Sequence, residues 1–561
     1  MKQTSAAPSS ALRPGTDAIA PGGHEGSAFQ RWIYPALLAF VWLLAYTYTF
    51  DPDLDLNGDN CMYYIYATSI ASGQGYTDLS SMTVSNTFPP GYPLLMAPLR
   101  FLTDSITAQK ILNGLFMLLS ILLLYRVMLR SGFRRELAFI SGCAMILSER
   151  VLHFASIMMS EMSFLFCSVV VIASLLRMDG KKAFWKDPWF WVMLAALGYA
   201  YHIRTQGIAL VGAVLLYFLC RLEWKQTLAT AAGFIVCCLP WMLRNKAQGL
   251  EQSRYFETIS QANPFRPEDG SLDIGGIVSR FFDTIGMLIS QALPNSLIPN
   301  VPYSIVGNFR EQVDPATPYI RMIGDYSAQP QTVGLWIMGL VSLGLICYGF
   351  WQFKRLRWML LGYLVCTFGV IAIFSTPSGN RYITTLLPVL TMGQFVGLYA
   401  LINKCWKKKF QKAFSPWPLV LLLFFCKGAL NYLEYVNSQP TPAAYRNYMQ
   451  IAQMVRANVD PSTVVICRKP QLFHLYSGTQ ARGYLYSSDD KAVLRELVKS
   501  KADFVVLDQL GYSSTPLYLL PAIQKNIDLF RVSVQLTLPD TYLLAFDRRK
   551  AAELLGMKYE E

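Results

Sequence analysis

The residues best suited to chemistry lie in the stretch DLDLNGDNCMYYIYATSIASGQGY, which begins at Asp53 directly after an apolar segment. It places three carboxylates, Asp53, Asp55 and Asp59, beside several tyrosines. A positioned carboxylate can take the proton of an attacking hydroxyl, which accelerates group transfer by about 10²–10⁴-fold. Asp is also a favoured N-cap residue, so Asp59 has a second interpretation as the cap of a short helix over NCMYYIYATSIAS. Its position alone does not decide between the two.

A second group of charged side chains follows later apolar segments, where membrane helices are expected to end. The segments are MMSEM with Glu161, YHIRTQG with His202 and Arg204, PWMLRN with Arg244, and STPSGNRY with Arg381. An acid and several arginines at one membrane face suit a lipid-borne phosphate, because guanidinium offers several donors in a planar fork. The alternative for each arginine is contact with lipid headgroups, and for Glu161 an ordinary acid at a helix end. Lys110 and His202 are further candidates for the same site.

The composition indicates that these residues are held by a membrane protein. Of the 561 residues, 53% are hydrophobic and only 15% are charged, against roughly 25% charged in soluble proteins. The net charge of +13 could suggest nucleic acid as a partner. However, the Lys and Arg residues stand in short clusters between apolar segments, which is how a polytopic membrane protein fixes its orientation. Nucleic-acid binding is therefore not expected.

A bilayer-crossing helix takes about 20 apolar residues, and eleven such segments can be found. They begin near residues 32, 108, 136, 157, 188, 206, 228, 333, 357, 382 and 417. With the N-terminus in the cytoplasm, every short basic connection lies inside: RSGFRR, KKAFWK, RLEWK, KRLR and KCWKKKFQK. Glu149 and Arg150 interrupt the third and fourth segments, so the count is uncertain by one hairpin there.

This topology predicts a disordered cytoplasmic tail over 1–30, a transmembrane domain over 31–436 with outer loops 51–107 and 245–332, and a separate outer domain over 437–561. The last region alternates helix-like and strand-like segments, and its length suffices for a small α/β domain. These segments are AAYRNYMQIAQMVRANV, STVVICR, DKAVLRELVKS, ADFVVLD and TYLLAFD.

Signatures of common soluble enzymes are missing from the sequence. It contains no G-x-x-x-x-G-K-[ST] loop, no H-E-x-x-H and no Gly-rich dinucleotide turn, and its four histidines are scattered. ATP-driven transport by this chain alone and zinc hydrolysis are not expected. No cofactor is predicted. The sequence leaves open whether a divalent cation takes part, although no cluster of ligands requires one.

The ordered set of short motifs resembles the integral-membrane glycosyltransferases of the C-type fold. LNGDNCMYYIYATSIASGQGY followed by PPGYPLLMAPL is similar to their first-loop signature, and MSEM, IRTQG, PWMLRN and GNRYITTLLPVL follow in the order that the family shows. The resemblance covers about residues 31–436. It is closest to the bacterial branch related to protein O-mannosyltransferases and the lipid A aminoarabinose transferase.

The resemblance implies transfer of a sugar from a polyprenyl-phosphate carrier, here undecaprenyl phosphate, to a hydroxyl or amine of a surface glycan, lipid or protein. Asp59 matches the first acid of the family's Asp-Glu pair, and Asn60 replaces the second. We assign Asp59 as the general base of an inverting transfer, with Asp55 as the alternative base. Arg204, Arg244 and Arg381 are the expected partners of the donor phosphate. In a Gram-negative cell the protein would be a multi-pass inner-membrane protein with a periplasmic C-terminal domain.

Two other classes of function remain as alternatives. A transporter or flippase of lipid-linked sugars would use the same outer arginines. It should also carry charges through both halves of the bundle and show an internal repeat of broken helices, which the sequence does not display. A membrane scaffold whose tail domain binds a partner would leave the acid-rich first loop without a purpose.

Overall fold

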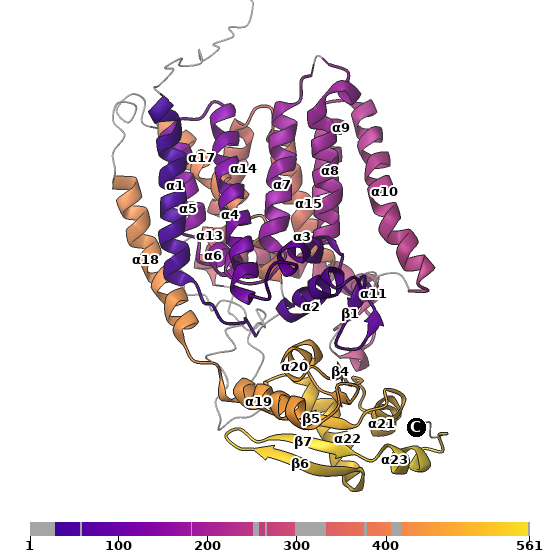
Figure 1. Ribbon diagram of the computed structural model, residues 1–561. Coiled ribbons are helices and arrows are strands. Elements are labelled where there is room, and N and C mark those ends of the chain that lie inside the picture. Colours follow the sequence, from indigo (N-terminus) through magenta and orange to yellow (C-terminus); the bar gives the residue numbers. More distant parts are fainter. Residues whose placement is uncertain are drawn as a thin grey trace, which may run out of the picture.

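The computed structural model describes residues 28–56, 59–180, 182–250, 257–263, 266–297, 332–374, 379–405 and 417–558. The predicted tail over 1–30 falls almost wholly outside these residues, as do much of the loop 245–332 and most of KCWKKKFQK. The described chain consists of a helical bundle, an outer layer built from the first loop, and a C-terminal domain with a small sheet (Figure 1).

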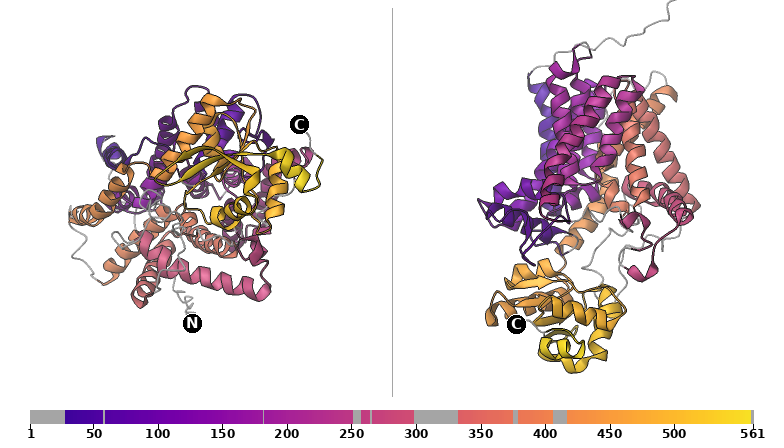
Figure 2. Two further views of the ribbon diagram at one scale, coloured as in Figure 1. Left: turned by 90° about the horizontal axis from the view of Figure 1, so that it is seen from below. Right: turned by 90° about the vertical axis from the view of Figure 1, so that its right-hand side faces the viewer.

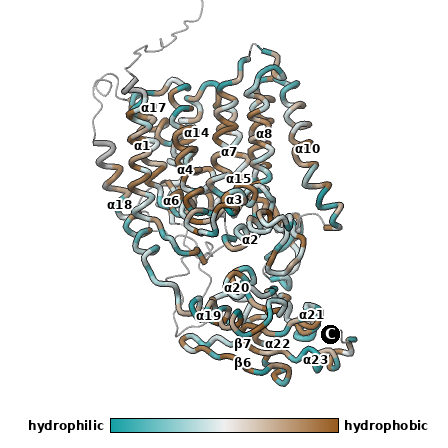
Figure 3. Tube along the Cα trace, in the orientation of Figure 1, coloured by the Kyte–Doolittle hydropathy of each residue, from teal (hydrophilic) through white to brown (hydrophobic). Residues whose placement is uncertain are grey.

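The bundle is built from helices that run between two opposite ends, with α1, α4, α7, α8 and α10 side by side in Figure 1. Its long helices are α1 (Ala28–Thr49), α4 (Ile106–Arg130), α7 (Glu161–Arg177), α8 (Pro188–Ile203), α9 (Gly207–Cys220), α10 (Trp224–Ala247), α14 (Val333–Gln352), α15 (Arg357–Ile373), α17 (Leu387–Cys405) and α18 (Trp417–Ser438). Hydrophobic residues cover their middle portions and polar residues their ends (Figure 3).

Four of the described helices, α1, α4, α10 and α14, are long and apolar enough to cross a membrane by themselves. Helices α5 (Arg135–Ile146) and α6 (Glu149–Ala155) form a broken pair bent by 63°, at the interruption that Glu149 and Arg150 indicated. The apolar helices α9 and α15 are 14 and 17 residues long, which is below the length that a bilayer normally takes. The chain is thus a multi-pass helical protein, and the count of eleven spans stays a prediction.

The segment predicted as the first outer loop, a name kept below, forms a layer under one end of the bundle, which we call the tail-domain end. It contains α2 (Asn60–Ala71), the two-stranded sheet β1 (Thr77–Asp78) and β2 (Thr83–Val84), and α3 (Gly91–Arg100). The predicted helix after Asp59 is therefore present. It is followed by Gly73 and Gly75, whose φ angles of +75° and +72° suit glycine.

Helix α3 approaches the end of α8 so closely that its first residue has to be glycine. A Cβ atom built on Gly91 would lie 2.6 Å from the carbonyl carbon and oxygen of His202. The Tyr199 hydroxyl donates a hydrogen bond of 2.9 Å to the Gly91 carbonyl. The PPGYP motif therefore seats the first outer loop directly on the backbone of the bundle.

The C-terminal domain is an α/β unit with a five-stranded sheet in the order β4-β3-β5-β7-β6. Strands β3 (Val464–Ile466), β4 (Gln480–Arg482) and β5 (Phe504–Leu507) are parallel, and β6 (Phe530–Leu536) and β7 (Thr541–Phe546) add an antiparallel hairpin. The helices are α19 (Ala443–Asn458), α20 (Pro470–Ser477), α21 (Asp490–Lys499), α22 (Leu520–Lys525) and α23 (Arg548–Leu554). The five segments predicted from the sequence correspond to α19, β3, α21, β5 and β7. Figure 2 shows this domain below the tail-domain end of the bundle.

Hydrogen bonds attach this domain to the first outer loop. The Lys469 ammonium contacts the Leu56 carbonyl, and the Gln471 amide donates to Asp78 at 3.0 Å. The Ala481 amide of β4 donates to the Ser80 carbonyl at 2.7 Å. The loop that carries Asp59 is therefore held between the bundle and the C-terminal domain.

The C-terminal domain also buries a carboxylic acid that should make its stability depend on pH. Asp508 is fully buried, and burial raises the pKa of its carboxyl from 3.8 to about 6 despite the Leu510 amide and the cations Arg468 and Lys469. Between about pH 4 and pH 6, Asp508 is ionised in the unfolded chain but still protonated in the folded protein. Its contribution to the free energy of unfolding therefore falls as the pH rises through this range. A shift of two units corresponds to about 3 kcal/mol.

We expect Asp508→Asn to unfold at a higher temperature than the wild type at pH 8 and at a similar temperature near pH 4. The amide oxygen can still accept from Leu510, so the change removes mainly the ionisable proton. The measurement is the thermal unfolding midpoint of the full chain across this pH range, with exposed Asp528→Asn as control. If the unfolding midpoint of the wild type and of Asp508→Asn depended on pH in the same way, Asp508 would not be the group with the raised pKa.

Candidate functional site

Asp59 occupies the N-cap position of α2, but its side chain does not cap that helix. Its side chain makes no hydrogen bond to the first turn of α2. Instead, its Oδ2 accepts from Nη2 of Arg381 at 3.0 Å, an ion pair in which both side chains are about one quarter exposed. The two residues are 322 positions apart in the sequence. The carboxylate is thus turned toward the bundle.

A second carboxylate, at the start of α7, completes the cluster. Glu161, the first residue of α7, is fully buried, and its Oε1 accepts from Nε of Arg381 at 2.7 Å and from Nη1 of Arg204 at 2.8 Å. Arg204 follows α8 and is 8% exposed. Four side chains from four separate segments therefore meet at the tail-domain end, and we call Asp59, Glu161, Arg204 and Arg381 the charged cluster.

Neutral hydroxyl groups fix the charged cluster to the first outer loop. Nη1 of Arg204 donates to Ser160 Oγ at 2.9 Å, and Ser160 Oγ lies 3.3 Å from the hydroxyl of Tyr63 on α2. Burial raises the pKa of Tyr63, so its hydroxyl stays protonated at neutral pH. The Tyr63 ring packs edge-on against Tyr92 of α3, with 4.9 Å between ring centroids. These contacts hold the segment after Asp59 against the start of α7.

A narrow cavity of about 130 Å³ opens beside the charged cluster. Asp59, Arg204 and Arg381 line it, together with aromatic and polar residues that include Phe88, Gln206 and Tyr382. The Arg204 guanidinium carbon lies 5.5 Å from the Tyr382 ring centroid, and Gln206 donates to the Tyr382 carbonyl at 3.0 Å. A group that enters this cavity therefore meets one carboxylate and two guanidinium groups.

Two acids and two arginines give the charged cluster a formal charge near zero. Each partly buried charge has a partner at hydrogen-bond distance, which offsets the cost of removing it from water. Glu161 contacts both arginines, whereas the side chain of Asp59 contacts Arg381 alone among the described residues. Asp59 is also the more exposed of the two acids, with 25% against 0%. It is therefore the carboxylate that an entering ligand can reach.

The structure places the other predicted residues elsewhere at the same end of the protein. Arg244 donates to the carbonyls of Ser85 at 2.7 Å and Tyr76 at 3.0 Å, and so holds the outer loop rather than facing Asp59. Lys110 is buried, and its ammonium contacts the carbonyls of Asp51 and Asp53 where the chain leaves α1.

Two further candidates also stand apart from the charged cluster. His202 lies 2.9 Å from the Cys237 carbonyl and connects α8 to α10. Asp55 does not line the cavity beside Asp59.

Sequence reasoning missed three residues that belong to the site: Ser160, Gln206 and Tyr382. Each stands next to, or two positions from, a residue that was identified, within MMSEM, IRTQG or GNRY. Tyr63, one of the tyrosines that follow Asp59, is buried against Ser160 as well. The residues beside the charged member of each motif could therefore have been identified by treating the whole motif as part of the site.

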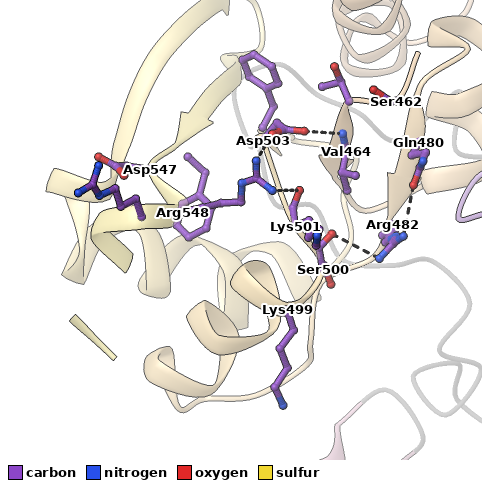
Figure 4. Close-up of a pocket in the computed structure, with 14 residues that line it drawn as sticks. Ser462, Val464, Gln480, Arg482, Lys499, Ser500, Lys501, Asp503, Asp547 and Arg548 are labelled. Atoms are coloured by element: carbon purple, nitrogen blue, oxygen red, sulfur yellow. Dashed lines mark hydrogen bonds and ion pairs between the residues drawn. The ribbon is translucent and has the colours of Figure 1, made fainter. Parts of the chain in front are cut away.

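A larger cavity of about 960 Å³ lies in the C-terminal domain, where β3, β4 and β5 begin (Figure 4). Its main ion pair joins Arg548 to Asp503 at 3.2 Å, and Arg482 contacts Ser500 and Gln480. No member of the charged cluster lines this cavity. We therefore place the candidate site by its chemistry rather than by cavity size. Among the described residues, no three His, Cys, Asp or Glu side chains are grouped to hold a metal ion.

Comparison with known proteins bears on the fold and the class of the chain. Residues 98–250, which include α4, α7, α8, α9 and α10, match the family described as dolichyl-phosphate-mannose-protein mannosyltransferase. No curated protein matches the chain in sequence.

Two solved structures resemble the chain over most of its length. ArnT from Cupriavidus metallidurans bound to undecaprenyl phosphate is 14% identical with a TM-score of 0.55, and the match covers 93% of this chain and 98% of that one. The oligosaccharyltransferase AglB from Archaeoglobus fulgidus, in complex with an inhibitory peptide and a dolichol-phosphate, is 13% identical with a TM-score of 0.53. The match covers 86% of this chain and 70% of that one. The chain therefore has the fold of the C-type membrane glycosyltransferases, as its motifs predicted.

Proposed function

We propose that this chain, with its C-type glycosyltransferase fold, moves a sugar from a polyprenyl-phosphate donor to a hydroxyl or amine of a surface glycan, lipid or protein. Undecaprenyl phosphate is the proposed carrier, and a hexose or a pentose is the group transferred. The reaction takes place at the tail-domain end of the bundle, which we assign to the periplasmic face. The match of residues 98–250 and the likeness to ArnT and AglB support the class of enzyme.

The contact between Asp59 and Arg381 carries this proposal, because it joins the two groups that the reaction requires. Asp59 is the general base that takes the proton of the acceptor hydroxyl. Arg381 and Arg204 bind the phosphate of the donor, where negative charge develops as the sugar leaves. The first outer loop limits the access of water to the anomeric carbon.

The bonds change in one displacement step. The acceptor oxygen attacks the anomeric carbon from the face opposite the phosphate, and the bond between that carbon and the phosphate oxygen breaks. The phosphate keeps the electron pair, and the acceptor proton passes to Asp59. Attack from the opposite face inverts the anomeric configuration.

Arg381 connects donor binding to activation of the base. Its Nη2 contacts Asp59 and its Nε contacts Glu161, so the guanidinium is oriented before any donor binds. A bound phosphate competes with Asp59 for Nη2 and releases the carboxylate toward the acceptor. Glu161 keeps its contacts with both arginines and holds them in position through this exchange.

The test is release of labelled sugar from a polyprenyl-phosphate donor by the purified full-length protein. We expect the wild type to release sugar together with the free polyprenyl phosphate. If the wild type releases no sugar from any donor but moves labelled donor across vesicle membranes, the protein is a transporter and the proposal is wrong.

A further inference from the structure

The opposite end of the bundle contains a cavity that sugar transfer does not use. It has a volume of about 750 Å³ and lies between the ends of α4 and α7, the start of α8 and the turn between α14 and α15. Its lining consists of Arg130, Ser131, Leu176, Arg177, Trp189, Phe353, Lys354 and Arg355. We call it the basic cavity. Three of the basic connections that predicted the membrane orientation flank it.

The charges of the basic cavity are not balanced within its lining. Four of the lining residues are cations, and none is an acid. The carboxylate of nearby Asp187 accepts from the amides of Trp189 at 2.9 Å and Asp179 at 2.6 Å. Three helices end at the cavity and α8 begins there. With roughly −0.5 elementary charge at each C-terminus and +0.5 at the N-terminus of α8, about 3 positive charges remain.

Three residues that line the basic cavity also carry buried donors without partners. Among the described residues, the Nε atoms of Arg177 and Arg355 and the hydroxyl of Ser131 are buried and make no hydrogen bond. Arg177 is held by its ring contact with Trp189, with 4.3 Å between the guanidinium carbon and the ring centroid. Arg355 is held by the carbonyl of Met178. Buried donors normally have an acceptor, so these three point to an acceptor that the chain itself does not supply.

We propose that the basic cavity binds the phosphodiester headgroup of an anionic glycerophospholipid in the leaflet opposite the reaction site. The phosphate oxygens accept from Arg177, Arg355 and Ser131, while Arg130 and Lys354 at the exposed rim add long-range attraction. Leu176 and Trp189, both partly exposed, provide apolar surface for the upper part of the acyl chains. The ligand is therefore amphipathic rather than a free anion.

An orientation signal alone would not produce this arrangement. Orientation requires only that Lys and Arg lie close to the end of a span, where they are normally solvated. It requires neither a cavity nor buried guanidinium nitrogens that lack acceptors. The exposed Arg134 at the same end, paired with Glu136 at 3.6 Å, is typical of a residue that serves orientation only.

The experiment measures binding of lipids to the delipidated full-length protein by native mass spectrometry. The probes are phosphatidylglycerol, phosphatidylcholine with the same acyl chains, and glycerol phosphate. We expect phosphatidylglycerol to bind at least tenfold more tightly than phosphatidylcholine. The double variant Arg130→Gln/Lys354→Gln changes exposed rim residues that are not needed for folding, and it should weaken phosphatidylglycerol binding roughly 30-fold.

Arg134→Gln removes one cation from the same end outside the cavity, and it should change the affinity by less than threefold. Glycerol phosphate should compete only at far higher concentration, because it lacks acyl chains. Equal competition would show that a soluble phosphate ester, not a lipid, is the ligand. The same preference for phosphatidylglycerol in wild type and double variant, or no preference in either, would overturn the proposal.

Discussion

Asp59→Asn is expected to lower kcat by about 10²–10⁴-fold and to leave the protein folded. Asn keeps an oxygen that can accept from Nη2 of Arg381, so the contact that orients the arginine persists while the basic carboxylate is lost. Donor binding should not weaken, because the phosphate partners are intact and the phosphate no longer has to displace a carboxylate from Nη2 of Arg381. The measurement is single-turnover release of sugar from a labelled polyprenyl-phosphate donor, together with the donor concentration at half saturation.

Two other acids of the same loop serve as matched comparisons for this variant. Asp53→Asn changes an exposed residue and should keep wild-type turnover. Asp55→Asn tests the alternative base, and it should retain most of the activity because Asp55 does not line the cavity beside Arg381. Equal turnover by wild type and Asp59→Asn, or loss of activity in Asp55→Asn alone, would show that Asp59 is not the base.

Arg381→Gln is expected to combine a large loss of activity with a loss of stability. It removes a donor from the position where phosphate charge develops, which should lower kcat by about 10²–10³-fold. It also leaves the fully buried Glu161 with Arg204 as its remaining cation. Breaking a buried ion pair by removing one partner costs about 3–5 kcal/mol, and the remaining arginine should hold the loss near the lower value.

A second substitution separates these two effects. Glu161→Gln added to Arg381→Gln removes the buried carboxylate, and the new amide oxygen can still accept from Arg204, which loses its ion-pair partner. The double variant should therefore recover only part of the lost stability, without recovering turnover. Arg381→Lys restores the charge but not the planar fork, so it should fall between Gln and the wild type. The control is Arg266→Gln, an exposed residue of the second outer loop. If the Glu161→Gln/Arg381→Gln double variant recovered full activity, Arg381 would not be a phosphate-binding residue.

The order of the elements could be predicted well from the sequence, because it depends on local patterns. The starts predicted near 188, 206, 333 and 357 coincide with the first residues of α8, α9, α14 and α15 within one position. In the C-terminal domain, the two missed strands are β4 and β6. Strand β4 has only three residues, QAR, which is too short for an alternating pattern to be recognised. Strand β6, FRVSVQL, alternates apolar and polar residues as a half-buried strand does, so its sequence did carry the signal.

The members of the charged cluster could be predicted less completely, for a geometric reason. Helix ends on one side of the membrane identify the residues that share a face, which was enough to select Asp59, Glu161, Arg204 and Arg381. They do not determine which way a side chain points around the end of its helix. Arg244 shares that face, yet its donors are satisfied by the carbonyls of Ser85 and Tyr76. Only the packing of the outer loop distinguishes it from Arg381.

The close approach of Gly91 to His202 has a consequence for protein engineering. Exchange of donor or acceptor preference between relatives would naturally be attempted by grafting the first loop alone. In this protein the grafted loop would have to pack against the backbone of His202, where there is no room for even one methyl group at position 91. The loop and the last turn of α8 form one transplantable module, and a hybrid that includes both has the better prospect of folding.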